Sequence, residues 1–266
     1  MKKQNNKPLL IAGPCVIENQ EICDIIATEV NRVASLYSMI PVFKGSFEKA
    51  NRTSHLSFKG IDRHKALDIL SNITSNFKML TITDVHSPDD VEEVKDSVTW
   101  LQIPAFLSRQ TDLIIACSNS MKPTLIKKGQ FLSPEACEFV ANKFRSGLGK
   151  ALMICERGFS FGYNDLIVDA TTVPRIKSSS KCPVIVDCTH SLQKPNRNNG
   201  TSGGNPSLVG TLANFAFATG AGGIFIEVHP DPKSSPSDSE SILELNKLEE
   251  IVKESMKIYN ALNGKS

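Results

Sequence analysis

The stretch KMLTITDVHSPDDVEEVKD, residues 78–96, contains the unit that decides the fold. Residues 78–86 form a short apolar run rich in β-branched side chains, typical of a buried strand, and end in Asp84 and His86. Ser87 and Pro88 then mark the start of a helix, because Ser caps a helix and Pro fits its first position. The stretch therefore predicts a strand, a polar strand end and a helix in succession.

The same unit recurs on both sides of this stretch. Further strands are expected at residues 8–14, 39–45, 98–104, 124–129, 151–158, 183–190 and 223–230. Amphipathic helix patterns separate them, including one that starts at Ser133 and Pro134 and a last one near residues 241–260. Eight strands alternating with eight helices in 266 residues predict an α/β protein, a single-domain (β/α)8 TIM barrel over residues 1–266.

Composition and charge narrow the class of protein. With 30 basic and 28 acidic side chains, the net charge of +2 gives no overall attraction to nucleic acid or membrane. The apolar run LLIAG near the N-terminus is too short for a signal peptide, and no later run could span a bilayer. The seven cysteines form no C-x-x-C pair, so a disulfide framework is not expected. We therefore expect a cytoplasmic protein without nucleic-acid or membrane partners.

Polar residues gather where the predicted strands end. In a TIM barrel the active site forms at the carboxyl ends of the strands, whereas the first halves of these strands are apolar. The side chains concerned are Cys15, Lys44, Asp84, His86, Gln102, Lys127, Lys128, Glu156, Arg157, Asp187, His190, Glu227, His229 and Asp231. We expect a polar site at that end of the barrel.

One part of this set is cationic. FKGSFEKANRTSH, residues 43–55, follows the second strand and supplies Lys44, Lys49 and Arg52, and the fifth and sixth strands add Lys127 and Arg157. Cations that converge repel one another unless an anion lies among them, and phosphate or carboxylate is the natural partner. The pattern predicts an anionic substrate.

The other part has the ligand types of a transition metal. The eighth strand of a closed barrel lies between the seventh and the first, which brings Cys15, His190 and Glu227 together, with Asp231 or Asp238 in the following loop. Thiolate, imidazole and carboxylate suit Zn²⁺ or Fe²⁺. Plainer alternatives are a buried Cys15 thiol, a hydrogen-bonded core His190, a solvated turn at Lys127 and Lys128, and a helix surface at Lys49 and Arg52.

The same residues carry a family resemblance. In chain order, FKGSFEKANRTS, TDVHSPDD, LQIPAFLSRQTDL, IKKGQFLSP, CERGFSFGYNDLIVD, DCTHSLQ and EVHPDP resemble 3-deoxy-D-manno-octulosonate 8-phosphate synthase over nearly the whole chain. The resemblance implies a TIM-barrel homotetramer. It also implies a transferase that condenses phosphoenolpyruvate with D-arabinose 5-phosphate and water and releases phosphate. The product would serve lipopolysaccharide biosynthesis.

The resemblance also implies roles for individual residues. Phosphoenolpyruvate would be held by Lys49, Gln102, Ala105, Lys127 and Arg157, and the arabinose phosphate by Asn51, Arg52 and Thr53. Arg109 would reach the sugar phosphate of a neighbouring subunit, and Lys44 and Ser46 complete the substrate-binding set. The catalytic candidates are Lys49, His190, Asp187 and His86.

The family has a metal-dependent branch with Cys in its first motif and a metal-independent branch with Asn there. AGPCVIEN matches the first branch, so the resemblance implies metal ligands at Cys15, His190, Glu227 and Asp238, and it favours Asp238 over Asp231. The implied cofactor is a divalent transition metal, Zn²⁺, Fe²⁺ or Mn²⁺.

Three other functions compete with this one. The first is 3-deoxy-D-arabino-heptulosonate 7-phosphate synthase, which shares the barrel, the cations and the metal ligands but accepts erythrose 4-phosphate. The second is a Schiff-base aldolase that uses Lys127 as its nucleophile. The third is a phosphosugar-binding regulator without catalysis, which would leave the metal ligands unexplained.

Overall fold

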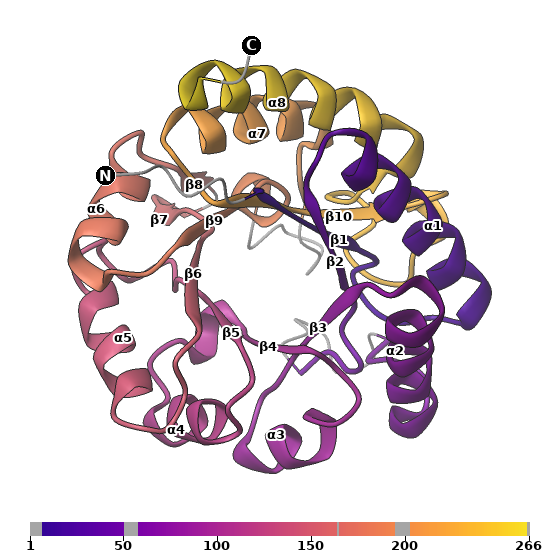
Figure 1. The fold of residues 1–266 in the computed structure, drawn as a ribbon, viewed down its shortest axis with the longest axis horizontal. Helices are drawn as coiled ribbons and strands as arrows, with labels where there is room; N and C mark the ends of the chain where they lie inside the picture. The colour runs from indigo at the N-terminus through magenta and orange to yellow at the C-terminus, as the bar shows by residue number, and fades with distance from the viewer. Residues whose placement is uncertain (1–6, 51–57, 164, 195–202, 265–266) are drawn as a thin grey trace.

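The computed structural model describes residues 7–50, 58–163, 165–194 and 203–264. Eight strands stand in a closed ring at the centre, and helices surround them (Figure 1). The barrel strands are β1 (Leu9–Gly13), β2 (Ile40–Lys44), β3 (Leu80–Asp84), β4 (Trp100–Ile103), β5 (Thr124–Lys127), β6 (Leu152–Glu156), β9 (Val184–Asp187) and β10 (Gly223–His229). The helices are α1 (Gln20–Leu36), α2 (Arg63–Phe77), α3 (Pro88–Val94), α4 (Thr111–Asn119), α5 (Cys137–Arg145), α6 (Thr172–Ser180), α7 (Val209–Ala218) and α8 (Leu248–Asn263).

The strands form one parallel barrel. Each strand pairs with the next one in the ring, and β10 pairs in parallel with both β9 and β1, which closes it. The expected (β/α)8 TIM barrel is confirmed, and all eight predicted strand segments contain a barrel strand.

Side chains fill the inside of the barrel below its carboxyl end. An inner apolar layer draws one residue from each of seven strands, and Trp100 of β4 packs against it. Its members are Ile11, Val42, Ile82, Leu125, Cys155, Ile185 and Phe225. A polar site can therefore lie only above this layer.

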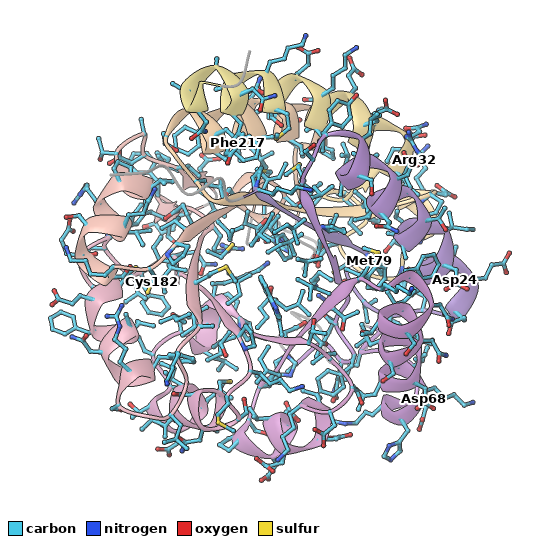
Figure 2. The ribbon with its side chains drawn as sticks, in the orientation of Figure 1. Asp24, Arg32, Asp68, Met79, Cys182 and Phe217 are labelled. Atoms are coloured by element: carbon cyan, nitrogen blue, oxygen red, sulfur yellow. The ribbon has the colours of Figure 1, made fainter. Side chains whose placement is uncertain are left out.

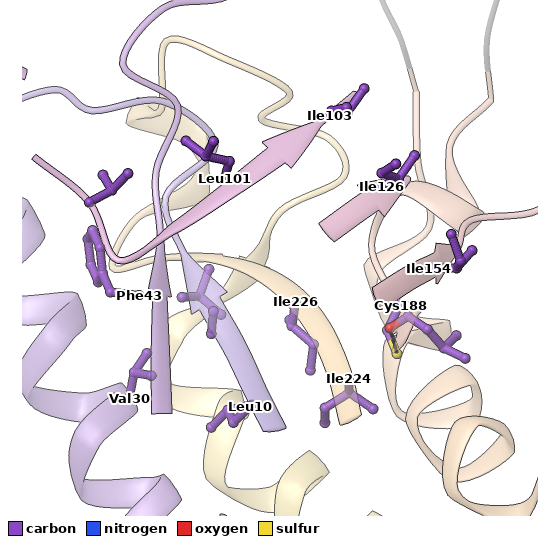
Figure 3. Packing of buried hydrophobic residues seen from close by; sticks show 14 of the residues in the cluster. Leu10, Val30, Phe43, Leu101, Ile103, Ile126, Ile154, Cys188, Ile224 and Ile226 are labelled. Carbon is purple, nitrogen blue, oxygen red and sulfur yellow. Dashed lines mark hydrogen bonds between the residues drawn. The ribbon is translucent and has the colours of Figure 1, made fainter. Parts of the chain in front are cut away.

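A larger apolar core lies between the strands and the helices (Figure 3). In β10, Ile224 and Ile226 point to this outer core, whereas Phe225 belongs to the inner layer. Residues of opposite parity in a strand face opposite sides. This alternation decides which polar residues enter the barrel.

Several elements differ from the sequence expectation. A β-hairpin of β7 (Phe159–Phe161) and β8 (Asp165–Ile167) follows β6, and the two-residue strand β11 (Leu243–Glu244) pairs with the end of β10. Residues 241–247, expected to be helical, contain β11 and the 3₁₀ turn Leu245–Lys247, so α8 begins only at Leu248. Such short elements depend on pairing with another strand, β7 with β8 and β11 with β10, which periodicity does not reveal.

The fifth helix also begins later than expected. Ser133 Oγ accepts a hydrogen bond from the Ala136 N–H at 3.1 Å, as a capping residue would, but the backbone around Pro134 forms i to i+3 turns. The α-helix starts at Cys137. By contrast, Ser87 caps α3 as expected by accepting a hydrogen bond from the Asp90 N–H at 3.2 Å.

Two general expectations can be compared with the structure. In the part of the chain that is described, no helix is both long and apolar enough to cross a membrane. The seven cysteines are all buried free thiols.

Candidate active site

The alternation of the strands selects the side chains that meet above the inner layer. Lys127 enters the barrel, and its Nζ lies 3.7 Å from the centre of the Phe225 ring. Lys128 points the other way, where its Nζ donates to the Gly158 carbonyl at 3.0 Å and lies 3.7 Å from Glu156 Oε2. Both lysines are buried, so the alternative of a solvated turn is wrong.

A thiol and two carboxylates form the centre of the site. One ligand atom each of Cys15, Glu227 and Asp238 lies within 4.8 Å of the other two. Cys15 Sγ donates to Asp238 Oδ2 at 3.1 Å and lies 2.7 Å from Ser237 Oγ. This trio is a possible metal site, since soft thiolate and carboxylate oxygen together suit a divalent transition metal.

The electrostatics of the trio suit a cation. Burial, reinforced by the negative charge of Glu227, raises the pKa of the Cys15 thiol above its ordinary value. Glu227 Oε2 is buried and has no hydrogen-bond partner among the described residues. A divalent cation would favour the thiolate form of Cys15 and would be coordinated by Glu227 Oε2.

His190 adjoins the trio without being part of it. Its Nε2 lies 3.4 Å from Glu227 Oε2, and its Nδ1 lies 2.8 Å from Asp187 Oδ2. Asp187 Oδ1 also accepts the His190 backbone N–H at 2.8 Å, which fixes the ring at the end of β9. A carboxylate behind a histidine orients the ring, as it does for histidines that bind metals.

Lys127 completes this group. Its Nζ donates to Asp187 Oδ2 at 2.7 Å and lies 3.3 Å from His190 Nδ1. Burial opposes the ionisation of Asp187, but the charges of His190 and Lys127 outweigh burial and hold the pKa of Asp187 far below its usual range. Asp187 is therefore a fixed anion.

Lys44 joins β2 to the trio. Its Nζ donates to Glu227 Oε1 at 3.1 Å, to the Cys15 carbonyl at 3.0 Å and to Ser46 Oγ at 2.9 Å. The close approach of β1 to β2 at this point requires Gly13, because a Cβ there would lie 1.9 Å from the Lys44 carbonyl oxygen. Lys44 thus neutralises a protein carboxylate.

Arg157 differs from these paired lysines. Its side chain is buried, and one nitrogen, Nη2, donates to Gln193 Oε1 at 3.1 Å. The second terminal nitrogen, Nη1, is buried and has no hydrogen-bond partner in the described part of the chain. Burial lowers the pKa of Arg157 although Asp187 opposes this effect. An anion would supply the missing acceptor.

Other predicted substrate-binding residues also lie at this end of the barrel. Gln102 is buried in β4, with no hydrogen-bond partner for its Oε1 among the described residues, and Ala105 begins the 3₁₀ turn after β4. Lys49 is buried, and burial alone would lower its pKa. The acidic groups around it, among them the carboxylates of Glu227 and Asp84, outweigh this effect and raise the pKa of Lys49 above its usual value.

Some of the predicted site residues do not lie with the others in the described structure. The Arg109 side chain is exposed, and its carbonyl accepts a hydrogen bond from Lys143. Asp231 lies apart from the trio and caps a 3₁₀ turn by accepting the Lys233 N–H. Asn51, Arg52 and Thr53 lie outside the described residues, so their proposed roles stay predictions.

Nothing in the sequence singles out two residues that adjoin the possible metal site. Ser237 contacts Cys15 Sγ from a Ser-rich loop in which nothing marks it out. Thr189 Oγ1 accepts the Glu227 backbone N–H at 2.9 Å and so holds β10 against the end of β9. Pairing across the barrel, rather than composition, gives both residues their place.

Comparison with known proteins agrees with this architecture. The family model described as "DAHP synthetase I family" matches residues 1–263. Relatives include proteins named 2-dehydro-3-deoxyphosphooctonate aldolase from Coxiella burnetii (43% identical, covering 93% of this chain and 88% of the relative) and Cupriavidus taiwanensis (40%, 93% and 88%). A protein of the same name from Bordetella bronchiseptica is 41% identical, covering 91% of this chain and 87% of the relative.

The chain, a closed (β/α)8 barrel, belongs to the DAHP synthetase I family. Within that family its curated relatives place it among the 2-dehydro-3-deoxyphosphooctonate aldolases, which are the 3-deoxy-D-manno-octulosonate 8-phosphate synthases. The expected family is confirmed, and it is an enzyme family. These relatives favour it over the heptulosonate synthase alternative.

Proposed function

We propose that this protein condenses phosphoenolpyruvate with D-arabinose 5-phosphate and water to give 3-deoxy-D-manno-octulosonate 8-phosphate and phosphate. C3 of phosphoenolpyruvate forms a bond to the aldehyde carbon of the open-chain sugar, whose oxygen takes up a proton. Water adds at C2, and phosphate leaves as the C2–O bond to it breaks. The product would serve lipopolysaccharide biosynthesis.

The observation that carries this proposal is the coexistence of two kinds of group at one end of the barrel. The buried Arg157 has an Nη1 without a hydrogen-bond partner among the described residues, and the trio of Cys15, Glu227 and Asp238, two of them buried, has the donor types of a metal site. Fixed cations stabilise the charge that moves between carboxylate, phosphate and carbonyl oxygen in the transition state. Arg157, Lys49, Gln102 and Ala105 would hold phosphoenolpyruvate.

Lys127 fits this reaction better than Schiff-base chemistry. An amine that attacks a carbonyl must be neutral, whereas Lys127 Nζ donates to the buried Asp187 at 2.7 Å. We therefore assign Lys127 to charge stabilisation and to the phosphoenolpyruvate site, and Lys44 and Ser46 to the rest of the substrate-binding set.

Cys15, Glu227, Asp238 and His190 would hold a divalent transition metal such as Zn²⁺, Fe²⁺ or Mn²⁺. When bound, the metal supplies a Lewis acid or a template for the aldehyde and water. His190, Asp187 and His86 are the candidates for moving protons. Asp187 keeps His190 in one orientation and so fixes which ring nitrogen faces Glu227.

The proposal takes residues 1–266 as one catalytic domain that works in the cytoplasm as a homotetramer. Buried free thiols are typical of a reducing compartment. Large apolar side chains are exposed on the loops that follow β4, β5 and β6, which are neighbouring strands, and such a surface is typical of a subunit interface. They are Phe106, Phe131, Phe161 and Tyr163.

The decisive experiment measures phosphate release from phosphoenolpyruvate with each sugar phosphate. Arabinose 5-phosphate should support turnover at a rate at least about a hundred times that with erythrose 4-phosphate, since a site built to pair substrate hydroxyls rejects poor matches. Dialysis against EDTA should remove the activity, and Zn²⁺, Fe²⁺ or Mn²⁺ should restore it. Preference for erythrose 4-phosphate would refute the proposed acceptor.

A further inference from the structure

Arg63 occupies a place that its own helix does not favour. It is the first residue of α2, where the positive end of the helix dipole repels a cation, and the first turn of α2 contains no acidic residue. Asp62 already caps the helix by accepting the Lys65 N–H at 3.1 Å. The reason for an arginine here must therefore lie in its contacts outside α2.

Those contacts join three segments of the chain. Arg63 Nη2 donates to Asp90 Oδ1 at 2.8 Å and to Glu93 Oε2 at 2.5 Å, both on α3. Arg63 Nη1 donates to Glu48, the neighbour of Lys49, and the guanidinium lies 4.6 Å from the centre of the Phe47 ring. Arg63 thus ties α2 to α3 and to the segment that follows β2.

Asp90 connects Arg63 to His86. Its Oδ2 accepts the His86 backbone N–H at 2.8 Å and lies 3.3 Å from His86 Nδ1. On the other side of the ring, His86 Nε2 lies 3.3 Å from Asp84 Oδ2. The His86 ring is also next to Phe47, with the ring centres 6.2 Å apart. Both ring nitrogens therefore face a carboxylate.

The charges alternate from the barrel interior to the surface. Lys44 Nζ, which pairs with Glu227, lies 4.0 Å from Asp84 Oδ1, so Asp84 lies between Lys44 and His86. Asp90 then lies between His86 and Arg63. In this order each carboxylate has a cation on either side, which stabilises a chain of charges in a partly buried place.

We propose that Arg63 and Asp90 are a positioning pair that fixes His86 as a doubly hydrogen-bonded imidazolium next to the active site. A ring whose two nitrogens both carry protons can donate a proton but cannot accept one. His86 would therefore serve the reaction as a fixed cation or proton donor and not as a proton acceptor. Only the kinetic part of this inference rests on the proposed function.

Other charged groups near His86 act in the same direction or are more distant. Asp84 and Asp90 face the ring directly, and Lys44 and Lys49 act on it through Asp84. Glu48 and Glu93 pair with Arg63 rather than with the ring. Burial would lower the pKa of His86, but the two aspartates outweigh burial and raise it.

The test is an NMR titration of the full-length protein with ¹³C-labelled histidine. The His86 signal is identified by its loss in His86→Gln. In the unaltered protein the pKa of His86 should lie above the ordinary value of about 6.5, and Asp90→Asn should lower it by about one unit or more. Arg63→Met should also lower it, because Asp90 is then no longer held against the ring.

The sign of the Arg63→Met shift separates positioning from simple charge. Loss of a nearby positive charge alone would raise the pKa of His86, and a raised or unchanged value would overturn the proposal. The matched control is Arg32→Met on the outer side of α1 (Figure 2). Arg32 likewise pairs with two glutamates, Glu29 and Glu249, and its loss should leave the His86 titration unchanged.

Kinetics give a second readout. Arg63→Met should lower kcat for phosphate release about tenfold, and Arg63→Lys, which can still pair with Asp90, should restore part of it. Arg32→Met should have no effect. If the unaltered protein released no phosphate, the proposed function would fail, whereas the NMR titration would still decide whether Arg63 positions His86.

Discussion

At the scale of the residue, Cys15 decides whether the barrel end holds a metal. We expect Cys15→Ala to lower the affinity for Zn²⁺ tenfold or more. Loss of a direct donor should cost at least as much as loss of a residue that supports a donor, which costs about 10–100-fold. Elemental analysis after dialysis against a defined Zn²⁺ buffer gives the metal content. Cys117→Ala, which removes a buried thiol of α4, is the control and should keep the metal.

Equal metal content in Cys15→Ala and in the unaltered protein would show that Cys15 is a buried thiol and not a ligand. In that case His190 Nε2, 3.4 Å away, would be the neighbour of the buried Glu227 Oε2, which has no hydrogen-bond partner among the described residues.

Arg157 allows a test of the anion site that does not depend on turnover. Arg157→Ala should weaken phosphoenolpyruvate binding about 10- to 150-fold, because it removes a charge-assisted contact worth about 1.5–3 kcal/mol. Isothermal titration calorimetry measures the change. Arg175→Ala removes an exposed arginine that pairs with Glu135, and it should bind phosphoenolpyruvate normally. Equal affinity in both variants would rule out Arg157 as the anion contact.

Sequence alone identified which residues gather at the barrel end, but not how they pair. Alternation within β5 and β6 selects Lys127 and Arg157 over their neighbours Lys128 and Glu156. The prediction that an anionic substrate balances all the converging cations was incomplete. Lys44 and Lys127 already neutralise Glu227 and Asp187. Pairings between strands 60 or 183 positions apart in the chain have no local signal.

At the scale of the element, the ionisation of Asp90 in α3 should make the free energy of unfolding depend on pH. Burial opposes its ionisation, but hydrogen bonds from Arg63 and from the His86 N–H outweigh burial and lower the pKa of Asp90. This stabilisation is complete above the ordinary aspartate pKa of about 4. It is lost as the pH falls from there through the lower native value.

Asp90→Asn should therefore lower the free energy of unfolding by about 1.5–3 kcal/mol at pH 7, and the difference from the unaltered protein should shrink below pH 4. Urea unfolding at a series of pH values measures it. Asp68→Asn, on the exposed side of α2, is the control (Figure 2). A difference that stays constant with pH would mean that the charge of Asp90 does not contribute.

Helices and strands whose own residues mark them, by a capping residue or a continuous apolar run, were predicted well. Ser87 and Pro88 gave the start of α3, and strands such as β9 and β10 carry continuous apolar runs. The β7–β8 hairpin and the short β11 were missed. They are too brief for periodicity, and β11 exists because it pairs with the end of β10.

At the scale of the whole molecule, the closed barrel follows from repetition. No single strand specifies it, but eight β-α units in 266 residues leave few alternatives, and the pairing of β1 with β10 completes the ring. The assembly of several chains has no such signal in one sequence. Only the resemblance and the exposed apolar side chains after β4, β5 and β6 point to it.

Arg109 makes the assembly testable, because its side chain is exposed on the loop after β4. If it completes the sugar-phosphate site of a neighbouring subunit, Arg109→Ala and Arg52→Ala should each be weakly active alone. Each site in a mixed tetramer would take residue 52 from one chain and residue 109 from its neighbour. Random assembly of equal amounts should then give about a quarter of the sites both arginines.

Phosphate release by the two variants, unfolded together and refolded, should therefore reach about a quarter of the rate of the unaltered protein, well above the mean of the two parents. Light scattering should give the mass of four chains. The control mixes Arg109→Ala with the double variant Arg52→Ala/Arg109→Ala, in which no site can regain Arg109. A mixture of the two single variants that stays at the parental mean would show that each chain uses its own Arg109 or none.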